Sequence, residues 1–284
     1  MSEQVKIAVV GAGYWGKNLV RNFDALEVLG LICDNRKGTL DHFSEQYPHV
    51  PVTDSFNSVL EDDSVTAVAI ATPAETHYQV VKKALLAGKH VFVEKPLALL
   101  EAEGIQLHEL AKDRKKVLMV GHLLQYHPVV VKLKQLVSAG ELGKLQYIYS
   151  NRLNLGKIRR EENILWSFAP HDISVILSLA DEMPDEVLSS GANYLHPKVA
   201  DVTLSHLSFP SGIRAHIFVS WLHPYKEQRL VVVGDRKMAV FNDVEPEDKL
   251  LLYPHRIEWK DHLPVPDKKE AEKVAVDQKE PLRE

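Results

Sequence analysis

The chain has 284 residues, of which 45% are hydrophobic and 26% are charged, and its formal net charge is -5. These values are ordinary for a globular protein and exclude a disordered, collagen-like or disulfide-stapled chain. The length predicts two domains or one large one. The slightly acidic balance predicts no nucleic-acid partner, because nucleic-acid-binding domains usually carry a basic patch or a high pI.

Targeting, redox and metal signals are few. Cys33 is the single cysteine and cannot form an internal disulfide, which fits a reducing, cytoplasmic location. The first apolar run has no basic segment before it, so we read it as a strand and not as a signal peptide. No run of about 18 apolar residues occurs, so we expect no membrane contact. The histidines form no ligand motif, so we expect no metal site.

The first half of the chain alternates strands and helices. Short apolar runs predict strands at 5–10, 28–33, 66–71, 90–94 and 117–121. Apolar residues at helical spacing predict helices at 15–26, 38–47, 75–87 and 99–114. This alternation is typical of βαβ units and a parallel sheet, so we predict an α/β domain over residues 1–122.

The pattern changes near residues 121–127. Helices are predicted at 127–138 and 171–180, and strands at 144–154, 186–194, 201–209, 213–221, 228–234, 237–242 and 249–253. Short links such as F-P-S-G at 209–212 are typical of hairpin turns and indicate a mainly antiparallel sheet. We therefore predict an α+β domain over residues 123–284. Its last 18 residues, which are highly charged, are predicted to form a solvated tail.

A glycine motif follows the first strand directly. Gly11, Gly13 and Gly16 form G-A-G-Y-W-G at the start of the first helix. Such glycines permit a tight turn, close approach to a pyrophosphate and close helix–strand packing. Asp34, after the second strand, can accept hydrogen bonds from both ribose hydroxyls, which favours NAD over NADP. Arg36 could soften that preference, and a glycine-rich turn without a ligand is the alternative. We expect cofactor contacts from Tyr14, Trp15 and Asn35 as well.

Two further motifs carry candidate chemistry. Glu94-Lys95-Pro96 ends the fifth strand, at the edge where open α/β sheets bind ligands. The proline fixes the backbone there, and a cis bond before it is one way of doing so. His171 and Asp172 follow Pro170 at the predicted start of a helix. There the helix dipole would favour the neutral, proton-accepting imidazole, and Asp172 would orient it or cap the helix.

In combination these motifs resemble the Gfo/Idh/MocA family of sugar and cyclitol oxidoreductases. The matching segments are V-G-A-G-Y-W-G, A-T-P-A-E-T-H at 71–77, E-K-P at 94–96 and A-P-H-D at 169–172, and the resemblance covers residues 5–250 or so. It implies a Rossmann domain followed by a domain whose open, mainly antiparallel sheet builds the substrate site and an oligomer interface, in a dimer or tetramer. Relatives usually end with one or two further helices, so we expect a C-terminal helix to be missing here.

The resemblance also implies roles for individual residues. Lys95 would bind the hydroxyl being oxidised, and His171 would be the acid/base. Thr72, Pro73, His77, Glu94 and Lys95 would line the cofactor. Lys95 as the base is the alternative assignment, if burial favours its neutral form. Many relatives carry an aspartate where this chain has Ser167.

Within the family, the segments N-R-L-N-L-G (151–156) and W-S-F-A-P-H-D-I-S (166–174) are most similar to nucleotide-sugar 3-dehydrogenases acting on UDP-GlcNAc or its uronate. A nucleotide-sugar enzyme needs cations for the diphosphate, so Arg152, Lys157 and Arg159 weakly favour this class over a free-sugar or inositol dehydrogenase. The presence of Lys95 and His171 argues against a non-catalytic NAD-bound sensor. The predicted substrate contacts are Lys95, Tyr126, Arg152, Asn154, Lys157, His171 and Asp172, with Arg159 and His127 as weaker candidates.

Overall fold

A computed structural model describes residues 5–156, 158 and 162–276. The chain divides into two compact units, Met1–Gly121 and His122–Glu284, and each is described separately.

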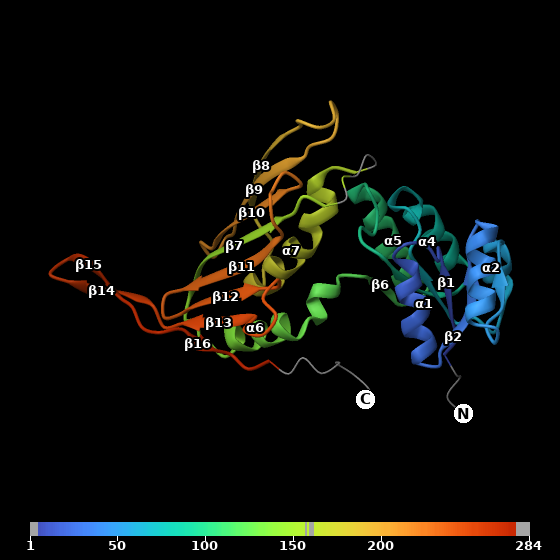
Figure 1. Ribbon diagram of the computed structural model, residues 1–284, viewed down its shortest axis with the longest axis horizontal. Coiled ribbons are helices and arrows are strands. Elements are labelled where there is room, and N and C mark those ends of the chain that lie inside the picture. Colours follow the sequence, from blue (N-terminus) through green and yellow to red (C-terminus); the bar gives the residue numbers. More distant parts are fainter. Residues whose placement is uncertain (1–4, 157, 159–161, 277–284) are drawn as a thin grey trace. The chain divides into compact units, whose positions relative to one another are not determined.

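The first unit is a six-stranded parallel sheet with the order β3-β2-β1-β4-β5-β6 (Figure 1). The strands are β1 (Ile7–Val10), β2 (Leu29–Cys33), β3 (Val52–Thr53), β4 (Ala67–Ile70), β5 (His90–Val93) and β6 (Leu118–Val120). The helices are α1 (Gly16–Ala25), α2 (Lys37–Gln46), α3 (Phe56–Glu61), α4 (His77–Leu86) and α5 (Glu101–Asp113), with a short 3-10 helix, η1 (Ala74–Thr76).

β1 directs apolar side chains to both faces of the sheet, as is typical of a parallel sheet that is covered on both sides. Ala8 and Val10 belong to one core cluster, and Val9 belongs to the other. A strand that is buried on both faces reads as a continuous apolar run, as this one does. The predicted Rossmann architecture is confirmed. The two-residue strand β3 and the six-residue helix α3 were not predicted.

The second unit is built on an eight-stranded sheet with the order β16-β13-β12-β11-β7-β10-β9-β8. Its strands are β7 (Leu145–Leu153), β8 (Glu186–Ala192), β9 (Val202–Ser208), β10 (Arg214–Ser220), β11 (Glu227–Gly234), β12 (Met238–Asn242), β13 (Leu250–Tyr253) and β16 (Glu272–Lys273). All neighbours are antiparallel except β7 and β10, which run parallel. The predicted open, mainly antiparallel sheet is thereby confirmed.

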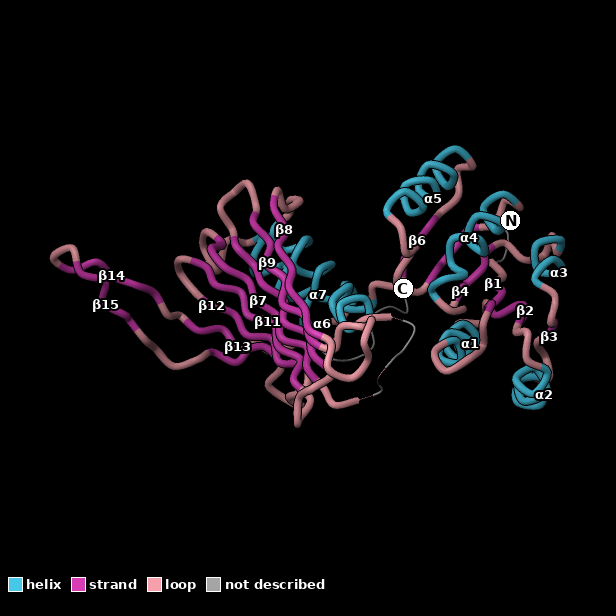
Figure 2. The backbone as a smooth tube through the Cα atoms, turned by 90° about the horizontal axis from the view of Figure 1, so that it is seen from above, coloured by secondary structure: helices cyan, strands magenta, loops and turns pink. Residues whose placement is uncertain are grey.

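Helices cover one face of this sheet. The 3-10 helix η2 (Leu123–Tyr126) precedes α6 (Pro128–Ser138), and α7 (Ile164–Ala180) follows β7. The helices and the inward side chains of the strands, such as Ile148, Ile217 and Val232, form one core cluster. Alternate residues of the same strands point to the opposite face. No helix described in this unit lies on that face, and Figure 2 shows the helices on one side of the strands.

A separate two-stranded ribbon, β14 (Arg256–Lys260) and β15 (Leu263–Asp267), leaves the sheet after β13 (Figure 1). The prediction of a wholly solvated C-terminal tail is wrong. Glu272–Lys273 pair with β13 as β16, and Val274 and Val276 pack against the core. The outer edge of β13 offers unpaired backbone groups to this charged segment, and its two valines add apolar contacts with the core.

Candidate functional site

The glycine motif folds as a turn that only glycine fits. Gly11 has φ +88, and a Cβ at Gly16 would lie 1.9 Å from the carbonyl oxygen of Gly11. The turn is anchored to the next strand, because Gly11 N donates to Cys33 O at 2.8 Å. Helix α1 begins at Gly16, so its N-terminus faces the turn. The backbone therefore fits a dinucleotide pyrophosphate, which binds at such helix N-termini.

Asp34 lies directly after β2 and is held by Arg36. The guanidinium donates to both carboxylate oxygens, from Nε to Oδ1 at 3.0 Å and from Nη2 to Oδ2 at 3.1 Å. Burial alone would raise the pKa of Asp34, but the hydrogen bonds and charge of Arg36 lower it below its usual value. Asp34 is thus an ionised acceptor suited to ribose hydroxyls. The Arg36 side chain is 60% exposed, whereas that of Asp34 is 4% exposed.

Trp15 links the glycine turn to the E-K-P motif. Its indole Nε1 donates to Glu94 Oε1 at 2.6 Å, a connection that the sequence did not indicate. Burial raises the pKa of Glu94, and the Trp15 hydrogen bond opposes this effect. Lys95 follows and is half-buried, and the Lys95–Pro96 peptide bond is cis, which is the conformation considered for this motif. Tyr14 is 81% exposed beside the turn, and Asn35 is also exposed.

His77 is buried below the turn after β4. Its Nδ1 lies 2.6 Å from the carbonyl oxygen of Pro96, and its Nε2 lies 2.9 Å from that of Thr72. With 1% of its surface exposed, the imidazole is enclosed between these two backbone segments, and a cofactor contact by His77 stays a prediction. The two carbonyl groups that it contacts belong to the segments that follow β4 and β5. Thr72 is half-buried and Pro73 is exposed, so both remain accessible to a ligand.

The second unit carries His171, but in a different setting from the one predicted. Helix α7 begins at Ile164 and includes Pro170, so His171 lies within the helix and not at its N-terminus. Asn163 caps the helix, and its side chain accepts from Trp166 N at 3.0 Å. The dipole argument for a neutral His171 therefore does not apply. His171 is half-buried, and Ser167, on the preceding turn, is buried.

Asp172 neither caps the helix nor orients His171 in the way expected. It accepts from Arg152 Nε at 2.8 Å and Nη2 at 3.2 Å, and from Ser150 Oγ at 2.7 Å. Burial alone would lower the pKa of Arg152, but the charge of Asp172 raises it above its usual value. The pair joins β7 to α7. Because these donors and acceptors are occupied, the geometry does not favour direct substrate contact by either side chain.

The other predicted substrate contacts differ in exposure. Tyr126 is 53% exposed at the end of η2. His127 is structural, because its Nδ1 accepts from Val129 N at 3.2 Å as the N-cap of α6. Asn154 is half-buried just after β7. Lys157 and Arg159 lie outside the described residues.

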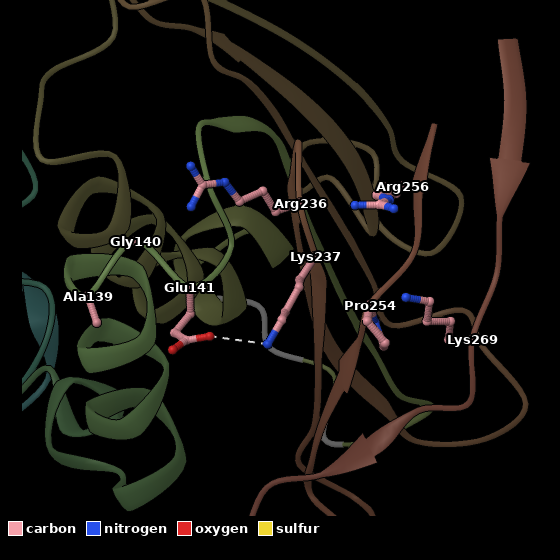
Figure 3. A pocket seen from close by; sticks show the side chains of 8 residues that line it. All are labelled: Ala139, Gly140, Glu141, Arg236, Lys237, Pro254, Arg256 and Lys269. Atoms are coloured by element: carbon pink, nitrogen blue, oxygen red, sulfur yellow. Dashed lines mark hydrogen bonds and ion pairs between the residues drawn. The ribbon is translucent and has the colours of Figure 1, made fainter. Parts of the chain in front are cut away.

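A hollow of about 420 Å³ in the second unit contains none of the predicted site residues (Figure 3). Cationic side chains line it, and Lys237 there is paired with Glu141 at 3.1 Å. Within the described part of the chain, no three His, Cys, Asp or Glu side chains are grouped to hold a metal ion. No described helix is long and apolar enough to cross a membrane.

Comparison with known proteins gives the family. A scyllo-inositol 2-dehydrogenase (NAD(+)) from Bacillus subtilis is 29% identical over 82% of this chain and 72% of its own length. A UDP-N-acetylglucosamine 3-dehydrogenase from Acidithiobacillus ferrooxidans is 28% identical over 84% of this chain and 71% of its own. The solved structure of a protein assigned as an oxidoreductase, from Magnetospirillum magnetotacticum MS-1, is 30% identical with a TM-score of 0.78 and covers 88% of this chain and 80% of its own.

Both units also match family domains. Residues 5–122 match the NAD-binding Rossmann fold of the oxidoreductase family, and residues 130–240 match the GFO/IDH/MocA C-terminal domain. The chain therefore belongs to the Gfo/Idh/MocA family of NAD-binding oxidoreductases.

Proposed function

We propose that this protein oxidises a secondary hydroxyl of a sugar, most specifically C3 of a nucleotide-sugar, by hydride transfer to NAD. The observation that carries the proposal is the cluster at the carboxyl edge of the first sheet. The glycine turn, Asp34 and Lys95 lie at the ends of β1, β2 and β5, where open α/β sheets bind their ligands. NAD, when bound, supplies the hydride acceptor.

Lys95 and His171 would share the work on the hydroxyl. As a cation, Lys95 would hydrogen-bond the reacting oxygen and stabilise the developing alkoxide charge. His171 would accept the hydroxyl proton. Its half-buried position on α7 leaves it access to a ligand without full solvation. This division of roles makes each residue necessary for turnover, although NAD should still bind without either one.

The nucleotide-sugar assignment is supported by the A. ferrooxidans relative and by the segments around 151–156 and 166–174. The second candidate, a cyclitol dehydrogenase, is supported by the B. subtilis relative. Arg152 no longer separates the two candidates, because Asp172 holds its guanidinium. Diphosphate binding would therefore depend on cations other than Arg152.

A substrate panel tests the proposal. The purified chain with NAD is mixed with UDP-GlcNAc, its uronate, other nucleotide-sugars and the inositols, and absorbance is followed at 340 nm. We expect NADH to form with a nucleotide-sugar. Turnover of inositols alone would contradict the nucleotide-sugar assignment, and no turnover of any sugar or cyclitol while NAD remains bound would support the sensor alternative.

Two substitutions test the residue roles. We expect Lys95→Met and His171→Asn each to lower the rate by about 10² or more while NAD still binds. Isothermal titration with NAD provides the control for folding. Near-normal turnover in both variants would contradict the mechanism.

A further inference from the structure

Trp15 connects two parts of the first unit that lie far apart in the sequence. It is the N-cap residue of α1, directly after the glycine turn, and its side chain makes no capping hydrogen bond in its own helix. Its indole Nε1 instead donates to Glu94 Oε1 at 2.6 Å, across 79 positions of the chain. Glu94 directly precedes Lys95. The bond therefore joins the segment that fits a pyrophosphate to the segment that carries the candidate catalytic lysine.

The size of the tryptophan side chain explains how this contact is made. The sheet order places β4 between β1 and β5. Neighbouring strands lie about 4.8 Å apart, so the ends of β1 and β5 are separated by about 10 Å. A short side chain after β1 cannot cross that distance. Tryptophan combines a large ring with one N–H donor at its edge, and Trp15 uses that donor to reach Glu94.

The Glu94 carboxyl receives hydrogen bonds from two donors. The first is the Trp15 indole, and the second is the backbone amide of Lys95. Burial raises the pKa of Glu94 above its usual value, whereas these two hydrogen bonds act to lower it. The carboxyl thus connects the side chain of Trp15 with the main chain of Lys95, so a displacement of the carboxyl would change both contacts.

Gly121, which follows β6, makes room for this carboxyl. Its backbone N donates to Val93 O at 2.8 Å, so it lies beside the end of β5. A Cβ at Gly121 would lie 3.1 Å from Glu94 Oε1 and 3.1 Å from Phe92 Cζ. Both distances are shorter than an ordinary van der Waals contact, so a side chain there would press on the carboxyl. The neighbouring strand is therefore shaped to accept Glu94 in the position that Trp15 holds.

Packing of α1 against the sheet does not depend on Trp15. Leu19 and Val20 are buried on that helix and share a core cluster with Val9 of β1. Trp15 is 40% exposed, and among the described residues of the first unit it belongs to neither core cluster. The indole N–H is thus better explained by its effect on Glu94 than by attachment of the helix.

We propose that Trp15 is a positioning residue for Lys95 and acts through the Glu94 carboxyl. Because Trp15 follows the glycine turn directly, one hydrogen bond keeps the turn and the backbone of the lysine in a fixed geometry. A misplacement of about 1 Å at a catalytic group can cost about 10² in rate. The inference rests on the proposed role of Lys95 and gives Trp15 and Glu94 an effect on turnover that is separate from cofactor contact.

Trp15→Phe tests the proposal, because it keeps an aromatic ring and removes the N–H donor. At saturating NAD and substrate we expect kcat to fall about tenfold, while the NAD dissociation constant changes less than about threefold. Glu94→Ala should lower kcat as much. Glu94→Gln keeps an acceptor oxygen for the indole and should retain most of the rate. Trp259→Phe is the matched control, since it makes the same change at a residue of β14 that is 71% exposed.

The double variant Trp15→Phe/Glu94→Ala tests whether the two residues act through one interaction. It should be no slower than Glu94→Ala alone, because the indole has already lost its acceptor in that variant. Losses that multiply would overturn the proposal. A normal kcat in Trp15→Phe, or a loss confined to the NAD dissociation constant, would overturn it as well.

NMR of the indole protons separates this proposal from the proposed function. The chain has four tryptophans, and Trp15→Phe identifies the Trp15 signal by its loss. Hydrogen bonds to a carboxylate are short and strong, so we expect this proton to resonate downfield of the other three and to move upfield in Glu94→Ala. A signal that does not respond to Glu94→Ala would overturn the positioning proposal alone. An unmodified chain that turns over no substrate, with the indole response intact, would contradict the proposed function and the role in turnover with it.

Discussion

Replacing Gly16 by alanine is the sharpest test of the glycine turn. The added Cβ would lie 1.9 Å from Gly11 O and 2.9 Å from Gly11 C. Both are backbone atoms, so no side-chain rotation can relieve the contact and the turn itself must move. Overpacking of this kind costs about 1–3 kcal/mol. Because the displaced turn is the one that would bind the pyrophosphate, we expect the loss in both folding stability and NAD affinity.

Denaturant unfolding and isothermal titration measure the two losses separately. A binding loss of about 1–3 kcal/mol corresponds to a rise of about fivefold to 150-fold in the NAD dissociation constant. Gly38→Ala is the matched control, because a Cβ at Gly38 meets nothing within 4 Å and the residue lies in helix α2. It should raise stability by about 0.5–1 kcal/mol. Gly16→Ala with unchanged stability and NAD affinity would refute the reasoning.

The remaining predictions concern the cofactor carboxylate, the buried ion pair and pH. Asp34→Ala should weaken NAD binding about tenfold to hundredfold, because hydrogen bonds to a charged acceptor are lost, and NADP binding less; titration with both cofactors checks this, and equal losses would contradict it. Arg152→Met should cost about 3–5 kcal/mol in denaturant unfolding by leaving Asp172 buried without its partner. The double variant Arg152→Met/Asp172→Leu should recover part of that loss, whereas additive losses would argue against the pair. Burial, and then the charge of His206, lower the pKa of His216 below its usual 6.5. The unfolded state therefore takes up this proton first, so stability should fall as pH drops below about 6.5, and His216→Asn should reduce the slope of stability against pH; an unchanged slope would contradict this.

Local periodicity was sufficient for most of the fold. The apolar run at 5–10 and the helical spacing of apolar residues at 99–114 extend over whole elements, so the apolar pattern recurs several times within each. The two-residue β3 and six-residue α3 are too short to show a period. The ribbon β14–β15 was missed because the alternation of charged and apolar residues in R-I-E-W-K lasts only five positions and two prolines break the pattern in L-P-V-P-D. Its structure comes from cross-strand pairing, which a reading along the chain does not detect.

The start of α7 shows two local signals in competition. Proline is common at the first position of a helix, so Pro170 indicated a start near His171. Asn163 is also a strong N-cap, and its side chain accepts from Trp166 N. The helix begins at the earlier position because the segment from Ile164 onward buries apolar residues in the core. This burial offsets the loss of the one backbone hydrogen bond that Pro170 cannot donate.

The sequence motifs predicted the candidate site residues, but they did not predict which groups those residues contact. The pair of Arg152 with Asp172 joins a strand to a helix, and neither partner's local sequence specifies the other. His77 shows the same limit more clearly. It was predicted from the A-T-P-A-E-T-H segment as a cofactor contact, yet its two ring nitrogens face the carbonyl oxygens of Thr72 and Pro96. A backbone carbonyl partner can be recognised only once the fold is known.

The position of His77 joins two motifs that the sequence presents separately. Thr72 follows β4 and Pro96 follows β5, which are neighbouring strands of the same sheet. One buried imidazole contacts both backbone segments, at 2.9 Å and 2.6 Å. Since Pro96 directly follows Lys95, the contact restrains the backbone that carries the candidate catalytic lysine. The two motifs therefore form one structural unit, in which His77 restrains the backbone beside Lys95 and leaves Thr72 and Pro73 accessible.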